Sequence, residues 1–297
     1  MSERVLRTTS PAGLDREGLP MRLFEKAKRR GVWNPSDLDF TADRGDWRAL
    51  DEPERDLLLR LTALFQAGEE SVALDLLPLI ETVAAEGRLE EELYLATFLF
   101  EEAKHVDLFR RFLDEVAEER GDLSRYHGPS YRELVCVELP AALGRLRSDR
   151  SPAAQAEASV TYNMIVEGVL AETGYHGYFT VLDRRGILPG MRQGIERLQE
   201  DEARHIAYGV HLLSRLVAEH GEIAWNAIRA RFERLVPLAV GVVGEIFGPY
   251  DPVPFGLSPD EFLGFAMTQF ERRFARIERA LRGEPAADDA EPGAAPV

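Results

Sequence analysis

The sequence is short of cysteine and of positive charge. Cys136 is the single cysteine among 297 residues, which excludes an internal disulfide framework and fits a reducing compartment. The chain has 36 Lys and Arg against 52 Asp and Glu, a formal net charge of −16. Nucleic acids and anionic membranes both attract concentrated positive charge, so we expect neither as a partner.

Long apolar runs are also missing. The longest, residues 235–247, contains Pro237 and Glu245 and is too short to span a bilayer. The amino-terminal residues lack the continuous apolar core of a signal peptide. With 45% hydrophobic residues the chain is nevertheless able to bury a sizeable core. We therefore expect a cytoplasmic protein that is not inserted in a membrane.

Strand patterns are almost absent, and apolar residues recur with the helical period from about residue 51. The first 45 or so residues are rich in glycine and proline, and we expect them to wrap the domain as loops and short turns. Residues 283–297 read as a disordered acidic tail. We predict one all-α domain over residues 1–282, with helices at about 51–76, 88–116, 131–146, 153–182, 189–221, 223–247 and 258–281.

Six polar residues lie where the helical pattern requires an apolar side chain. Burying an isolated carboxylate costs on the order of several kcal/mol even after the protein relaxes. A bound divalent cation offsets that cost directly. These candidate metal ligands are Glu69, Glu102, His105, Glu167, Glu202 and His205.

The six residues form a repeat. Glu69 and Glu102 are 33 residues apart, and Glu167 and Glu202 are 35 apart. The second glutamate of each pair begins Glu-x-x-His, which places both side chains on one helix face, one turn apart. A helix-loop-helix of this length returns the chain antiparallel at about the same height. Two single glutamates and two Glu-x-x-His motifs on four helices are typical of a carboxylate-bridged dinuclear site in a ferritin-like four-helix bundle.

A single Glu-x-x-His motif could also be a solvated pair on a helix surface, so the assignment depends on the whole pattern. Neighbouring acids outside the pattern are not expected to be metal ligands. Glu70 and Glu101 lie about 100° round their helices from the apolar stripes, which predicts exposure to solvent. Glu172 forms an i,i+4 pair with His176 that has no counterpart in the other half. Asp201 is either a partner that fixes a histidine tautomer or a surface acid.

The donor set indicates the kind of metal. Four carboxylates and two imidazoles suit iron and manganese, and they neutralise two divalent ions. The absence of thiolate argues against a structural zinc site.

At these residues the sequence resembles the small, metal-bearing subunit of class I ribonucleotide reductase, over about residues 51–270. The resemblance is carried by Glu69, Glu-Glu-Ala-Lys-His ending at His105, Glu167, and Asp-Glu-Ala-Arg-His ending at His205. Radical-generating members commonly have a tyrosine four residues after the first motif histidine, where this chain has Phe109. They also use a tyrosine in the tail to relay the radical, and residues 283–297 contain none.

The sequence is more similar to the ribonucleotide-reductase-small-subunit-like ligand-binding oxidases. Val72 and Tyr162, three residues after Glu69 and five before Glu167, match that family. The resemblance implies a manganese/iron cofactor, a bound long-chain fatty acid and an ether crosslink between Val72 and Tyr162. In a regular α-helix Tyr162 would lie about 140° from Glu167, a mismatch that a π-bulge would reduce. Without the resemblance both residues would be ordinary core side chains.

The function we expect is that of an oxidase that activates O2 at one manganese and one iron, with two irons as the alternative. We place manganese in the half of the site that contains His105. We expect an apolar tunnel ending at the metals, walled by the ligand helices and by residues 236–247. Related subunits commonly form homodimers. Two alternatives stay open: a radical-generating ribonucleotide reductase subunit, and a fatty-acid-binding or iron-storage protein.

Overall fold

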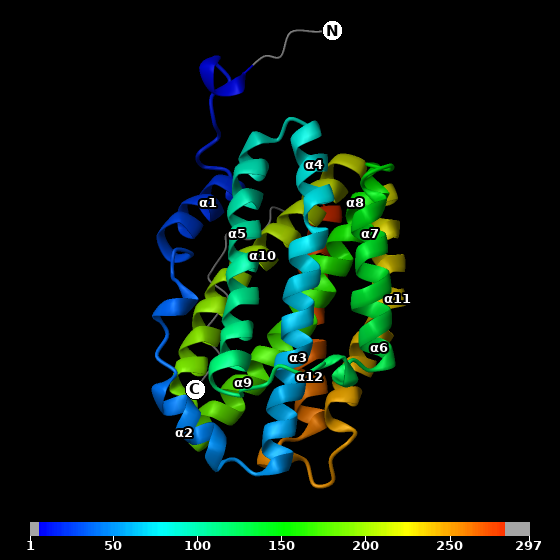
Figure 1. Ribbon diagram of the computed structural model, residues 1–297. Coiled ribbons are helices and arrows are strands. Elements are labelled where there is room, and N and C mark those ends of the chain that lie inside the picture. Colours follow the sequence, from blue (N-terminus) through cyan, green and yellow to red (C-terminus); the bar gives the residue numbers. More distant parts are fainter. Residues whose placement is uncertain (1–5, 283–297) are drawn as a thin grey trace.

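Four long helical segments form the core of the molecule. In the computed structural model, which describes residues 6–282, α3 (Glu52–Asp75) packs against α5 (Leu89–Glu115). A segment made of α8 (Pro152–Ser159), η5 (Val160–Ala171) and α9 (Glu172–Arg185) packs against α10 (Pro189–His220) (Figure 1). No strand occurs within residues 6–282. The predicted all-α, ferritin-like bundle is therefore confirmed.

The third core segment contains a π-helix. It consists of α8 (Pro152–Ser159), η5 (Val160–Ala171) and α9 (Glu172–Arg185), which follow one another without a break. In η5 the backbone bonds join residues five apart, so such residues lie about one turn apart. The wider turn lies where the Tyr162 spacing requires it. Gly186 ends the segment at φ 63°, a left-handed conformation that glycine adopts without strain.

Local sequence explains where the first core helix begins. Asp51 and Glu54 form a capping box: Asp51 Oδ1 accepts from the Glu54 N–H at 2.9 Å, and Glu54 Oε2 accepts from the Asp51 N–H at 3.2 Å. Pro53 lies in the first turn, where a helix needs no N–H donor. The side chain of Asp43 similarly accepts from the backbone N–H groups of Gly190 and Met191 at the start of α10.

The structure corrects the expectation for the amino-terminal segment. It contains α1 (Leu19–Arg30), a helix that packs on α5 and α10, and then α2 (Thr41–Ala49). Met21, Leu23 and Ala27 on α1 are buried in the core. The glycines and prolines that suggested loops instead mark helix ends, because Pro20 occupies the first turn and Gly31 caps the last.

The remaining helices cover the core. The bundle is surrounded by α4 (Leu77–Ala85), α6 (Pro129–Tyr131), η4 (Arg132–Glu138), α7 (Leu139–Arg145), α11 (Glu222–Phe247) and α12 (Pro259–Leu281). Short 3₁₀ turns lie at η1 (Arg7–Thr9), η2 (Pro35–Asp37), η3 (Ser124–Tyr126) and η6 (Pro254–Gly256). No helix within the described part of the chain is long and apolar enough to cross a bilayer. The expected acidic tail, 283–297, lies outside the described residues.

Candidate metal centre

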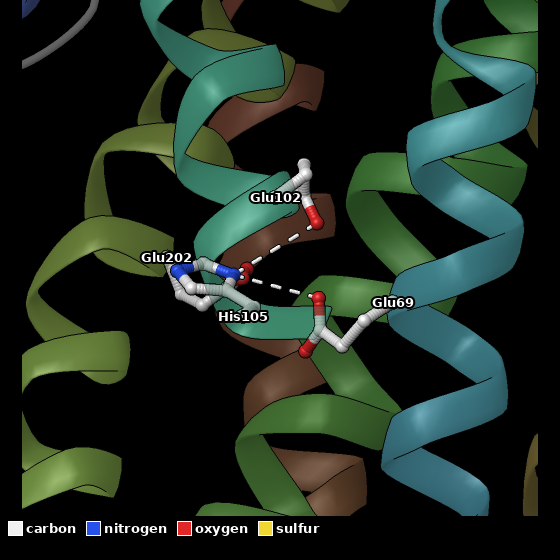
Figure 2. A group of neighbouring side chains, drawn as sticks. All are labelled: Glu69, Glu102, His105 and Glu202. Carbon is white, nitrogen blue, oxygen red and sulfur yellow. Dashed lines mark ion pairs between the residues drawn. The ribbon is translucent and has the colours of Figure 1, made fainter. Parts of the chain in front are cut away.

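The six candidate ligands meet in the middle of the bundle. Each is at most 6% exposed, and they come from α3, α5, η5 and α10. Figure 2 shows Glu69 on α3, Glu102 and His105 on α5, and Glu202 on α10 pointing toward one another. The spacing of the sequence motifs therefore predicted the assembly of this cluster.

The cluster consists of two overlapping groups of donor atoms. Glu69, Glu102, His105 and Glu202 can place one donor atom each within 4.8 Å of the others. Glu102, Glu167, Glu202 and His205 can do the same. Glu102 and Glu202 belong to both groups, which is the arrangement that two neighbouring cations sharing carboxylates require.

The two shared carboxylates face both histidines. Glu102 Oε2 lies 3.8 Å from His105 Nδ1, and its other oxygen, Oε1, lies 3.1 Å from His205 Nδ1. A single oxygen of Glu202, Oε1, is 3.3 Å from His105 Nδ1 and 3.5 Å from His205 Nδ1. Glu69 and Glu167 each approach one histidine only, at 3.4 and 3.6 Å.

Several donor atoms in this cluster have no hydrogen-bond partner, although they are buried. They are Glu102 Oε2, His105 Nδ1, Glu167 Oε1, Glu202 Oε2 and His205 Nδ1. Buried polar atoms are normally hydrogen-bonded, so unpartnered atoms that converge on one point call for an explanation. Oxygen and nitrogen donors around two cations supply one, and the residues present thus fit a dinuclear centre.

Burial controls the protonation of these acids. It raises the pKa of Glu69 well above the usual range and, together with repulsion from Glu202, raises the pKa of Glu167 to about 8. Burial also opposes ionisation of Glu202, but the nearby histidines overcome it and lower its pKa to about 2. Two divalent cations would displace the retained protons, because a cation favours the ionised carboxylate.

Two further acids hold the histidines by their other ring nitrogen. Asp201 Oδ2 lies 3.3 Å from His105 Nε2, and Glu101 Oε2 lies 2.9 Å from His205 Nε2. Such bonds fix the ring orientation and leave Nδ1 free for a metal. Asp201 is fully buried, so it is the partner that orients a histidine and not a surface acid. The prediction that Glu101 is exposed is wrong, since it is 1% exposed.

Buried cations compensate these two acids. Lys104 Nζ lies 2.9 Å from Asp201 Oδ2, and the Trp33 indole N–H donates to the same oxygen at 2.9 Å. Arg204 bonds Glu101 at 2.6 Å and also contacts Asp201. Glu101 faces Arg204 and α1 instead of solvent, which explains how it lies off the apolar stripe and is still buried.

Sequence reasoning missed the residue that holds Glu167. Asn163 Nδ2 donates to Glu167 Oε2 at 3.1 Å, and Asn163 Oδ1 of the same side chain accepts from the Ser159 hydroxyl at 2.9 Å. One oxygen of Glu167 is thereby fixed and the other left free. The i,i+4 spacing of Asn163 and Glu167 was the available signal.

The other acids considered from the sequence lie outside the cluster. Glu70 is exposed, as predicted. Glu172 does not pair with His176. It instead faces Arg273 of α12 at 3.8 Å, while His176 lies 3.6 Å from Glu261.

Val72 and Tyr162 both lie in the core near this cluster. Val72 is 2% exposed, and Tyr162 is fully buried. The Tyr162 hydroxyl donates to Glu102 Oε1 at 3.1 Å. The π-helix η5 contains both Tyr162 and Glu167.

An apolar cavity leads to the same carboxylates. It encloses about 900 Å³ of empty space, its open mouth included, and Glu69, Glu102, Glu167 and Glu202 form its polar end. Its other walls come from α3, η5, α9 and the end of α11, including Val242, Val243, Ile246 and Phe247. The predicted wall from residues 236–247 is confirmed for its second half, 242–247. Tyr175 also lines the cavity, and its buried hydroxyl has no hydrogen-bond partner.

Comparisons with known proteins point to one family. Residues 22–250 match the sequence family "Ribonucleotide reductase, small chain". The R2-like ligand-binding oxidase from Sulfolobus acidocaldarius is 39% identical and superposes with a TM-score of 0.87. The match covers 95% of this chain and 97% of that one. An R2-like ligand-binding oxidase with an aerobically reconstituted Mn/Fe cofactor is 37% identical, with a TM-score of 0.87 covering 92% and 97%. A Y162F mutant of such an oxidase, also with an aerobically reconstituted Mn/Fe cofactor, is 38% identical, with a TM-score of 0.85 covering 92% and 97%.

Proposed function

The chain belongs to the ribonucleotide reductase small-chain family and, within it, to the R2-like ligand-binding oxidases, and we propose that it activates O2 at a dinuclear manganese/iron site. The observation that carries this proposal is the convergence of unpartnered donor atoms from four helices on one buried point. Relatives with Mn/Fe cofactors at 37–38% identity support the metal pair over two irons.

Each metal has its own end of the site. Glu69 and His105 would hold manganese, Glu167 and His205 would hold iron, and Glu102 and Glu202 would bridge them. When bound, the reduced pair supplies electrons to O2 and yields an oxidant for nearby C–H and O–H bonds. The chain supplies buried carboxylates that balance the charge, and histidines fixed by Asp201 and Glu101.

The cavity is suited to a long-chain fatty acid. Its four carboxylates form a polar end, and the cations they would hold would attract a ligand carboxylate. The apolar walls would bury the alkyl chain, which contributes about 0.8 kcal/mol per methylene. The free hydroxyl of Tyr175 offers a hydrogen bond to an oxygen of the ligand. The relatives are named as ligand-binding oxidases, in agreement with an occupied cavity.

An ether bond between Val72 Cβ and the Tyr162 oxygen is the proposed reaction within the chain. Forming it breaks the Val72 Cβ–H bond and the Tyr162 O–H bond, makes one C–O bond, and passes two electrons and two protons to O2. The tertiary Cβ–H bond of valine is among the weaker aliphatic ones. The hydrogen bond from Tyr162 to Glu102 gives the phenolic proton an acceptor, and the π-helix turns Tyr162 toward the face of Glu167.

The alternatives are less well supported. Phe109 is fully buried and stacks on Phe65 at 5.0 Å, so no phenol occupies the position of the usual radical tyrosine. A single dinuclear site with an apolar cavity suits oxidation of a bound molecule better than iron storage. We also propose a homodimer, from the family resemblance, and a cytoplasmic location, from the single cysteine.

The test is O2 uptake after anaerobic loading with Mn(II) and Fe(II). The wild-type chain should consume O2 without forming an iron mineral core. Glu202→Ala should lose metal and O2 uptake together, since Glu202 faces both halves of the site. Glu70→Ala is the matched control, because Glu70 lies beside Glu69 and is exposed. Full metal occupancy in Glu202→Ala, or a mineral core in the wild type, would contradict the proposal.

A further inference from the structure

An aromatic chain runs from the metal centre to the carboxylate of Glu91, which lies about three helical turns from Glu102 along α5. The Phe98 ring stacks on His205, with ring centroids 3.6 Å apart and planes 10° apart, and it lies 5.7 Å from the Tyr162 ring. Phe98 is 6.0 Å from Tyr94, and Tyr94 is 5.3 Å from Tyr208. Phe98, Tyr94 and Tyr208 are all fully buried.

The far end of this chain has what an oxidisable phenol needs. The Tyr208 hydroxyl donates to Glu91 Oε2 at 2.9 Å, so a proton acceptor is already in place. Glu91 is 4% exposed, and its other oxygen lies 3.2 Å from Arg215 and 3.9 Å from Arg88. Burial, which outweighs the effect of Arg215, raises the pKa of Glu91, so this carboxylate holds an added proton more readily than an exposed one.

Two other buried tyrosines near the centre lack such an acceptor. The hydroxyls of Tyr94 and Tyr175 have no hydrogen-bond partner. Burial raises the pKa of both phenols, and an oxidised phenol with nowhere to send its proton is unfavourable. Tyr94 is therefore suited to electronic contact between Phe98 and Tyr208, and Tyr208 is suited to hold the oxidised state.

We infer that Tyr208 is a second redox site, which gives up an electron through Tyr94 and Phe98 to the oxidant formed from O2 at the metal centre. In this step Tyr208 loses one electron and its phenolic proton, Glu91 gains the proton, and the O2-derived oxidant is reduced by one electron. The inference rests on the proposed oxidase function. Tyr162 can serve as a donor only once, because the ether bond consumes its hydroxyl, whereas oxidation of Tyr208 forms no covalent bond.

The test uses the Tyr162→Phe variant, loaded with Mn(II) and Fe(II) and then exposed to O2. With the nearest phenol removed, an organic radical should appear in the electron paramagnetic resonance spectrum. Its hyperfine structure should narrow when the protein contains ring-deuterated tyrosine. Adding Tyr208→Phe should abolish this signal, and adding Glu91→Gln should reduce it several-fold while Tyr208 remains. Tyr178→Phe is the matched control. Tyr178 is fully buried, its hydroxyl is hydrogen-bonded to the Thr62 hydroxyl at 2.7 Å, and it is not part of the aromatic chain.

Each outcome decides the inference. A tyrosyl signal that is lost only with Tyr208→Phe supports it. A signal that survives Tyr208→Phe, a signal insensitive to tyrosine deuteration, or O2 uptake without any radical would overturn it while leaving the oxidase proposal intact. Absence of O2 uptake by the wild-type chain would overturn both.

Discussion

Glu101 on α5 lies 2.9 Å from Nε2 of His205 on α10, so an acid on one helix orients a histidine on the other. Asp201 on α10 does the same for His105 on α5. Each acid immediately precedes the glutamate of its own Glu-x-x-His motif. The two motifs are thus reciprocal: each supplies two candidate ligands and the carboxylate that holds the histidine of its partner.

Replacing Glu101 with glutamine should weaken metal binding at the half of the site that contains His205. The neutral amide is a poorer partner for the ring N–H, and the change removes one of the two buried carboxylates that Arg204 contacts. We expect about a 10- to 100-fold loss of Fe(II) affinity, as is typical when such an outer partner of a histidine is changed. Competition with a chelator would measure it.

Glu70→Gln is the control for that experiment, since Glu70 is also next to a candidate ligand but faces solvent. Equal Fe(II) affinities for Glu101→Gln and the wild type would show that Glu101 does not serve the site.

Narrowing the cavity should displace the bound lipid and spare the metals. Val242 of α11 lines the cavity and is 3% exposed, and it is remote in sequence from every candidate ligand. Val242→Phe fills part of the cavity, so mass spectrometry of the denatured protein should find less fatty acid than in the wild type. Val240→Phe provides the control, because Val240 is on the same helix and 41% exposed. Undiminished lipid in Val242→Phe, or no lipid in the wild type, would speak against a fatty acid in this cavity.

The contact between Gly209 and Asn163 should be sensitive to a single methyl group. A Cβ at position 209 would overlap Asn163 Cβ and lie 2.8 Å from Asn163 Cγ, on a residue that holds Glu167. Gly209→Ala should lower the free energy of unfolding by about 1–3 kcal/mol through overpacking. Gly264→Ala on α12, where a Cβ meets nothing within 4 Å, should instead raise it by about 0.5–1 kcal/mol. Urea unfolding of both variants checks the contrast, and a neutral Gly209→Ala would contradict it.

The proposed ether bond should depend on O2 and on Tyr162. Protein loaded with both metals in air should be two hydrogen atoms lighter than apo-protein or anaerobically loaded protein, and its digest should contain a joined peptide pair. Tyr162→Phe should abolish the joined pair and retain most of the metal, because Tyr162 is not a proposed ligand. Separate, unmodified peptides containing Val72 and Tyr162 from aerobic, metal-loaded protein would rule out the bond.

The sequence predicted the bundle and the grouping of the six candidate ligands because both depend on helical periodicity. Glu69 and Glu102, or Glu167 and Glu202, can meet only if each pair of helices returns at the right length, and the spacing of 33 and 35 residues contains that information. The sequence also indicated an irregular third core helix, because Tyr162 and Glu167 are five residues apart and share a face only in the wider turns of a π-helix.

Contacts between distant segments could not be predicted in the same way. Glu101 lies off the apolar stripe, and only α1 and Arg204 show why it is buried. One signal was present: Glu101 and Asp201 occupy the same place in the two repeats. The helix α1 was not predicted, because Gly18 and Gly31, which lie at its two ends, are also typical of loops.

Anomalous diffraction from crystals of the protein assembled in air with both metals tests the central proposal most directly. Data collected at the manganese and iron absorption edges should show two metal positions between Glu102 and Glu202. Manganese is predicted beside Glu69 and His105, and iron beside Glu167 and His205. A single metal, no metal, or two irons under these mixed-metal conditions would contradict a manganese/iron oxidase.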